Sequence, residues 1–237
     1  MFFTGRNLQG ARDLSHRYFL VNKPFNMVSQ FISSHKVRLL GDLDYDFPEF
    51  THAIGRLDRE SEGLLILTTD RAVTRLLYAG DKKHQRVYLV MVKNEVSHEK
   101  LRALRKGVLI PVKGGEPYLA EPVAVRIVSE PTSIYRYATD ERERYPHTWL
   151  LITLTEGKFR QVRKMVSAIH HRCLRLIRIS IADLQLGDME PGTIRELDAK
   201  SFYQKSGLHP VQGNMGSAEA PASVSQSVND KRSPGAG

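Results

Sequence analysis

Short runs of apolar, branched and aromatic residues recur along the chain, each bounded by proline, glycine or charged residues. Runs of this length and composition are typical of buried β-strands. The runs lie at 18–24, 64–69, 86–93, 121–128, 148–154 and 174–181. The pattern therefore predicts a body rich in β-structure.

Helices are predicted between these runs by apolar spacing and by residues that favour helix ends. One covers 71–80 and ends at Gly80, and another begins after the N-cap residue Ser97 and ends at Gly107. In a third helix, over 160–172, apolar side chains at intervals of three and four residues form one face that packs on the body. The residues of this face are Val162, Met165, Val166 and Ile169.

The composition of the chain changes near its C-terminus. From about Lys205 it is rich in glycine, serine, alanine and proline, with too few large apolar residues to offset the entropy of ordering. We expect an N-terminal extension over 1–17, a folded domain over 18–204 and a disordered tail over 205–237. The folded domain forms either one body or two lobes joined through 61–70.

Length and composition suit a globular protein, because 237 residues with 41% hydrophobic content can bury a sizeable core. No run approaches the roughly 18 consecutive apolar residues of a membrane span, and the first residues lack the apolar core of a secretory signal. The single cysteine, Cys173, cannot form an internal disulfide, which agrees with a reducing compartment. We therefore expect a cytoplasmic protein with no membrane contact.

Charge points to a polyanionic partner. The chain has 35 Lys and Arg against 26 Asp and Glu, for a net charge of +9. The segment 158–178 holds much of this excess, with basic residues and two histidines but no acid. A solvated helix face is the alternative interpretation, but such a face normally interleaves acids with its bases. The uncompensated cluster favours a nucleic-acid interface.

Several enzyme signatures are absent from the sequence. It has no G-x-x-x-x-G-K-[ST] phosphate loop, no H-E-x-x-H zinc motif, no G-x-S-x-G nucleophile motif and no cysteine and histidine cluster with metal spacing. A nucleotide hydrolase or a zinc enzyme is therefore disfavoured.

Three segments, in this order, resemble the pseudouridine synthases, and within them the branch that acts on ribosomal RNA. They are GRLDRESEGLLILTTD (55–70), RVYLVMV (86–92) and EGKFRQVRKM (156–165). The resemblance covers about 18–197, and NKPFNMVSQF (22–31) is most similar to members that act on the large ribosomal subunit. It implies an α+β fold in which flanking helices cover a mixed, mainly antiparallel sheet with a central catalytic cleft.

The resemblance implies that the chain converts a specific uridine to pseudouridine without cofactor or metal. The bond between N1 and C1′ breaks, the uracil rotates, and it rejoins the ribose through C5. This chemistry needs an ionised carboxylate, either to attack covalently or to remove a sugar proton. By resemblance the carboxylate is Asp58. Its cationic partner is Arg163, whose guanidinium is able to make a bidentate contact.

Three further residues match family positions around the substrate. Tyr88 resembles the tyrosine that stacks on the target uracil, although a half-buried strand aromatic is the commoner role of a single tyrosine. Arg56 resembles the residue that fills the gap left by the extruded uridine, with a phosphate contact as its alternative. Leu176 resembles the apolar residue that packs on the base, although a strand leucine is more often simple core.

The basic segment is expected to bind the phosphates that flank the target nucleotide. The residues assigned to this contact are Lys158, Arg160, Lys164, Arg172, Arg175 and Arg178. The expected partner is 23S ribosomal RNA or a large-subunit assembly particle, bound by a monomer. Two alternatives stay open: a related enzyme acting on small-subunit RNA or transfer RNA, and a non-catalytic RNA-binding protein of ribosome assembly.

One position departs from the family pattern. Most relatives have Lys-Pro-x-Gly after the first strand, whereas this chain has Asn26 in place of the glycine. If glycine serves there to reach a positive φ, asparagine is among the least costly replacements. We therefore expect the turn to be retained.

Overall fold

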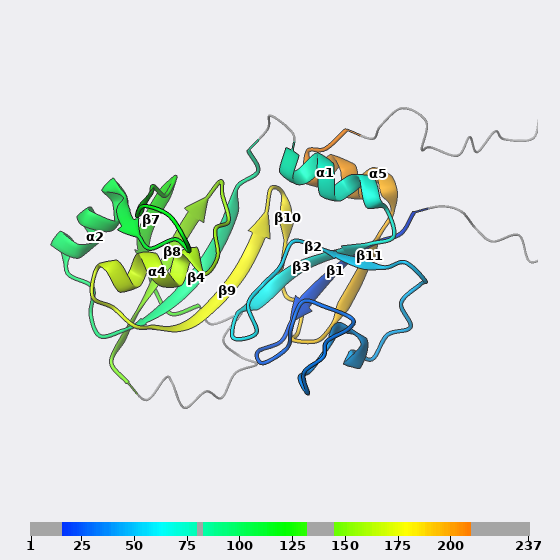
Figure 1. The fold of residues 1–237 in the computed structure, drawn as a ribbon, viewed down its shortest axis with the longest axis horizontal. Helices are drawn as coiled ribbons and strands as arrows, with labels where there is room; N and C mark the ends of the chain where they lie inside the picture. Colours follow the sequence, from blue (N-terminus) through cyan, green and yellow to red (C-terminus); the bar gives the residue numbers. More distant parts are fainter. Residues whose placement is uncertain (1–15, 80–82, 132–144, 210–237) are drawn as a thin grey trace, which may run out of the picture. The chain divides into compact units, whose positions relative to one another are not determined.

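A nine-stranded sheet forms the backbone of the computed structural model, which describes residues 16–79, 83–131 and 145–209 (Figure 1). Its main path runs β11-β1-β3-β9-β4-β8-β7, with β2 paired to β3 and β10 paired to β9. Every pairing is antiparallel except that of β3 with β9. The expected α+β fold with a mixed, mainly antiparallel sheet is confirmed.

The strands of this sheet are β1 (Tyr18–Lys23), β2 (His52–Ile54), β3 (Glu62–Thr68), β4 (Arg86–Lys93), β7 (Ala124–Val128), β8 (His147–Leu154), β9 (Cys173–Ile181), β10 (Leu184–Gln185) and β11 (Ile194–Leu197). A separate two-stranded sheet pairs β5 (Val108–Ile110) with β6 (Tyr118–Ala120). The helices are α1 (Arg71–Ala79), α2 (His98–Lys106), α4 (Gln161–Ala168) and α5 (Ala199–Ser206), with a 3₁₀ turn η1 (Leu40–Asp42). None of the helices in the described ranges is long and apolar enough to cross a membrane.

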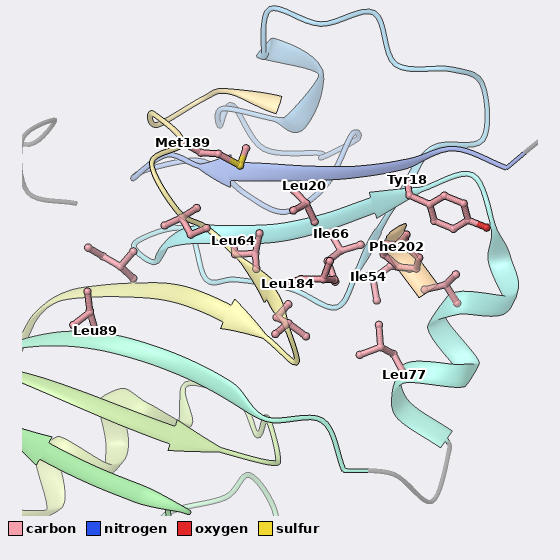
Figure 2. Close-up of a cluster of buried hydrophobic side chains, with 14 of the residues drawn as sticks. Tyr18, Leu20, Ile54, Leu64, Ile66, Leu77, Leu89, Leu184, Met189 and Phe202 are labelled. Carbon is pink, nitrogen blue, oxygen red and sulfur yellow. The ribbon is translucent and has the colours of Figure 1, made fainter. Parts of the chain in front are cut away.

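Helices α1 and α5 lie together over the part of the sheet that contains β1, β2 and β3 (Figure 1). Figure 2 shows Tyr18, Leu77 and Phe202 in the apolar cluster beneath them. The rings of Tyr18 and Phe202 stack with centroids 4.4 Å apart. Burial of one such aromatic side chain stabilises the fold by about 1.5–3 kcal/mol. The cluster therefore stabilises the part of the sheet that contains β1 and β3.

Two further clusters of buried side chains hold the parts of the chain that build the site. One packs α2 and α4 against β4 and β8. The other packs the long connection between β1 and β2, through Met27 and Leu40, and the loop between β2 and β3, through Leu57, against β1 and β3. Asn26 has φ 61° in this connection, so asparagine does adopt the left-handed conformation expected of the replaced glycine.

The pairing of β3 with β9 brings two segments that are distant in sequence into close contact. Gly63 lies opposite Arg178 and has φ +99°. A Cβ atom at this position would lie 2.3 Å from the Arg178 carbonyl oxygen, so only glycine allows the strands to approach this closely. The start of β3 is thereby held beside the middle of β9.

The structure differs from the predicted elements mainly at their ends. The third helix stops at Ala168 instead of extending to 172, because His170 takes a positive φ of 61° before β9 begins. Helix α5 and the short strands β2, β5, β6, β10 and β11 were not predicted. Helix α5 includes Lys205 and Ser206, and Leu208 is buried, so the expected tail starts too early at 205. Gly80, most of the expected extension over 1–17, and the tail from 210 lie outside the described residues.

Candidate active site

Asp58 lies in the loop between β2 and β3, and three contacts hold this loop in place. The neighbouring Leu57 side chain is buried in the core. The Leu57 amide donates to Ser29 Oγ at 3.0 Å, and Ser29 Oγ donates to the Leu57 carbonyl at 2.9 Å. The buried Lys23 ammonium donates to the Met27 carbonyl at 2.7 Å and lies 3.5 Å from the Arg59 carbonyl. The backbone around Asp58 is therefore fixed from both sides.

Arg163, from α4, closes the other side of this loop. Its Nη2 donates to the Glu60 carbonyl at 2.9 Å and to Ser61 Oγ at 3.3 Å. Its Nε lies 3.9 Å from Asp58 Oδ2, so the expected pair is brought together. The contact with Asp58 is not bidentate, because only Nε approaches the carboxylate while Nη2 donates to the Glu60 carbonyl and to Ser61 Oγ. Arg163 thus positions the loop and supplies positive charge to Asp58 at the same time.

A second arginine shares the Asp58 carboxylate. Arg160 Nη1 lies 3.7 Å from Asp58 Oδ2 and 2.9 Å from Glu60 Oε2. The hydrogen bond from Arg160 holds the pKa of the Glu60 carboxyl below its usual range. The Asp58 carboxylate thus has two guanidinium groups within 4 Å. Its side chain is still 24% exposed, so it also faces open space.

This open space is a cavity of about 450 Å³, a size suited to one nucleoside-sized ligand. Its wall includes Asp58, Tyr88 from β4 and Leu176 from β9. Tyr88 and Leu176 are almost fully buried, so each exposes only a small part of its side chain to the cavity. Arg56 is exposed at the cavity wall. The four residues predicted around the substrate therefore line the same space.

The residues predicted to bind phosphates divide into two groups. Lys158 and Arg172 are exposed, and Arg160 and Lys164 are partly exposed. These four remain available to a polyanion. Arg175 and Arg178, in contrast, are only 2% and 3% exposed, and their assignment to flanking phosphates is wrong.

The counter-charge for Arg175 comes from a distant strand. Arg175 Nε and Nη2 donate to the two carboxylate oxygens of Glu62 at 2.9 and 2.8 Å. Arg178 donates from Nε to the Leu64 carbonyl at 2.8 Å and lines the cavity from within. Both arginines lie on β9, between β3 and β4, but of the two only Arg178 lines the cavity.

Sequence reasoning missed several contributors to the site. Glu60 and Glu62 follow Asp58 at intervals of two residues. This alternation was the available signal that the counter-charges for the basic segment lie next to Asp58. Ser29 and the exposed Phe159 carried no comparable signal. The described residues contain no group of three or more His, Cys, Asp and Glu that could hold a metal ion.

Comparison with known protein families defines the class of enzyme. The model of a family described as RNA pseudouridylate synthase matches residues 17–168, more than half of the chain. The chain belongs to this family and is an RNA pseudouridine synthase, as the three sequence segments predicted.

Individual members of the family differ in their similarity to this chain, and two similar ones carry the same name. Ribosomal large subunit pseudouridine synthase E of Vibrio parahaemolyticus serotype O3:K6 is 37% identical over 187 residues, which cover 78% of this chain and 76% of the relative. The protein of the same name from Xanthomonas axonopodis pv. citri is 34% identical over 175 residues, covering 73% of this chain and 89% of the relative. A crystal structure of a pseudouridylate synthase superposes with a TM-score of 0.63 and 25% identity over 81% of this chain and 74% of that one.

Proposed function

We propose that this enzyme isomerises a specific uridine to pseudouridine in 23S ribosomal RNA of the large subunit. The similarity to relatives named ribosomal large subunit pseudouridine synthase E supports the choice of substrate. The observation that carries the chemistry is Asp58, placed between Arg160 and Arg163 at the wall of a nucleoside-sized cavity. With a ribosomal substrate, the enzyme would act in the cytoplasm, where ribosomes are assembled.

In this proposal Asp58 is the catalytic residue. It acts either as a nucleophile at C1′ or as a base toward a ribose proton while the bond between N1 and C1′ breaks. The uracil turns, and a bond forms between C5 and C1′ while the bond to Asp58 breaks, or while Asp58 returns the ribose proton. The proton then leaves C5, and N1 gains a proton. The product has the same composition as the substrate, so the reaction consumes no oxidant or reductant.

The remaining wall residues hold the reactants. Arg163 keeps the Asp58 loop in place and brings its guanidinium to 3.9 Å from the Asp58 carboxylate. Tyr88 stacks on the uracil and Leu176 packs against it, so the base stays in the cavity while its bond to the ribose is remade. Arg56, at the exposed edge, occupies the gap left in the RNA and offsets part of the unstacking cost.

We propose a monomer as the active unit. We assign catalysis to the domain that begins with β1 and ends with α5. In this arrangement the RNA backbone is bound by four exposed or partly exposed basic residues. Lys158 and Arg160 line the cavity, and Lys164 and Arg172 lie outside its wall.

The substrate assignment is tested by tritium release from RNA labelled at uridine C5. We would compare large-subunit RNA, small-subunit RNA, transfer RNA and large-subunit assembly particles at equal uridine concentration. We expect release from the large-subunit RNA or particle alone. Release from small-subunit RNA or transfer RNA instead would retain the chemistry and overturn the substrate. Tight RNA binding with no release from any substrate would favour a non-catalytic assembly factor.

A further inference from the structure

Phe159 is an exposed aromatic ring at the wall of the cavity that contains Asp58. Its side chain is 73% exposed, whereas Tyr88, the other aromatic residue of this wall among the described residues, is 7% exposed. The reaction proposed above uses Tyr88 and gives Phe159 no task. A large apolar group that stays in water beside a catalytic cavity is a candidate contact for a ligand.

The turn that carries Phe159 is held firmly. Gln161, which is buried, accepts a hydrogen bond from the Lys158 amide at 2.8 Å and donates to Glu156 Oε1 at 2.5 Å. The backbone N–H of Gln161 in turn donates to the Lys158 carbonyl at 3.1 Å. Arg160 then enters α4 with φ 53°, a conformation uncommon for a residue other than glycine. Phe159 is therefore presented on a turn whose backbone is fixed by its neighbours, so little ordering entropy is lost when it meets a ligand.

Positive charge surrounds the ring. Lys158 and Arg160 flank Phe159 in the chain, and the Lys164 ammonium lies 5.4 Å from the ring centroid. An aromatic face between cations matches single-stranded RNA, because the bases stack on the ring while the phosphates bind the cations. The ring lies at the cavity wall, so the base nearest to it belongs to a nucleotide next to the one inside the cavity.

We propose that Phe159 stacks on the nucleobase adjacent to the target uridine and holds the RNA while that uridine occupies the cavity. This inference rests on the proposed function and extends it to a second nucleotide. The contact is with the face of a base, so it tolerates any base and contributes affinity without adding to the salt dependence of binding. Phe159 is a positioning residue that does not touch the reacting atoms.

The test compares Phe159→Ala, Phe159→Leu and Phe159→Tyr with the matched control Phe50→Ala. Phe50 is 65% exposed and does not line this cavity. Tritium release would be measured under single-turnover conditions on the RNA that wild type modifies, at several salt concentrations. We expect Phe159→Ala and Phe159→Leu to weaken RNA binding about five- to tenfold, near the lower end of what one stacked base contributes. Tyrosine restores binding, and the rate at saturation and the salt slope stay as in wild type.

A second measurement uses 2-aminopurine at the position on either side of the target uridine, once that uridine is mapped. A fluorescence change on binding that is present in wild type and Phe50→Ala but absent in Phe159→Ala would support stacking and identify the side. Equal signals in all variants at both positions, a leucine as good as tyrosine, or a changed salt slope would each overturn the inference. Failure of wild type to release tritium from any RNA would instead count against the proposed function, and direct RNA-binding measurements on Phe159→Ala and Phe50→Ala would still show whether Phe159 contacts RNA.

Discussion

The pair formed by Arg175 and Glu62 allows a test of why part of the basic segment does not bind RNA. The Arg175 side chain is 2% exposed and that of Glu62 is 8% exposed, and two hydrogen bonds of 2.8 and 2.9 Å join them. Replacing Arg175 with methionine removes both bonds and leaves the Glu62 carboxylate away from water. Removing one member of a buried pair costs about 3–5 kcal/mol.

The surroundings of Glu62 place this cost near the lower end. The buried Lys23 ammonium is also attracted to Glu62, so some compensating charge is retained. We therefore expect Arg175→Met to lower the free energy of unfolding by about 3 kcal/mol. The double variant Glu62→Met with Arg175→Met removes both members of this pair and should recover most of the loss, with a coupling between the two sites above about 2 kcal/mol.

Urea denaturation at fixed pH would measure these differences, with an unchanged m-value as the sign that two-state behaviour is kept. In parallel, the salt slope of RNA binding by the folded Arg175→Met protein should equal that of wild type, because Arg175 reaches no phosphate. A loss of stability below about 1 kcal/mol together with a flatter salt slope would refute this reasoning and return Arg175 to the RNA-binding surface.

Three further outcomes follow from the structure. Gly63→Ala should destabilise the fold by at least about 2 kcal/mol, because its Cβ would lie 2.3 Å from the Arg178 carbonyl oxygen on β9. Gly114→Ala is the control for backbone strain, because Gly114 has φ +71° and a Cβ there would meet nothing within 4 Å. Equal midpoints of thermal unfolding for the two variants would contradict the steric argument. Burial lowers the pKa of Lys23 to about 8. Between that pH and 10.5 the unfolded chain keeps a proton that the folded protein has lost, so stability should rise with pH in wild type and rise less in Lys23→Met; parallel urea midpoints against pH would exclude this linkage. Arg160→Ala combined with Lys164→Ala should reduce the salt slope of RNA binding by roughly 0.7 for each single-strand phosphate that the variant no longer neutralises, and an unchanged slope would place the RNA on another face.

The parts of the fold that were predictable are those with a local signal. The apolar runs located the longer strands, and Ser97 and Gly107 marked the ends of α2 as predicted. Helix α5 and strands such as β10 were missed because their short segments are stabilised by packing and pairing with distant parts of the chain.

The same distinction explains the site. Asp58, Tyr88 and Arg163 belong to ordered motifs, and the structure brings them to one cavity and its support. The burial of Arg175 was not predictable from its neighbours, because its counter-charge is Glu62, 113 residues away in the sequence. The basic segment therefore contains exposed basic residues and also Arg175, which is buried in an ion pair. Only the pairing of β3 with β9, which brings Glu62 to Arg175, distinguishes the buried residue from the exposed ones.

The most direct test of the account compares wild type with Asp58→Asn, a change that keeps size and removes the charge. Tritium release from large-subunit RNA or its assembly particle and RNA affinity would be measured on the same preparations. We expect wild type to release tritium and Asp58→Asn to release none, while RNA affinity stays within a few-fold because Asp58 faces the cavity between two arginines. Turnover by Asp58→Asn at the wild-type rate, or loss of RNA binding together with turnover, would contradict the assignment of Asp58 as the catalytic carboxylate.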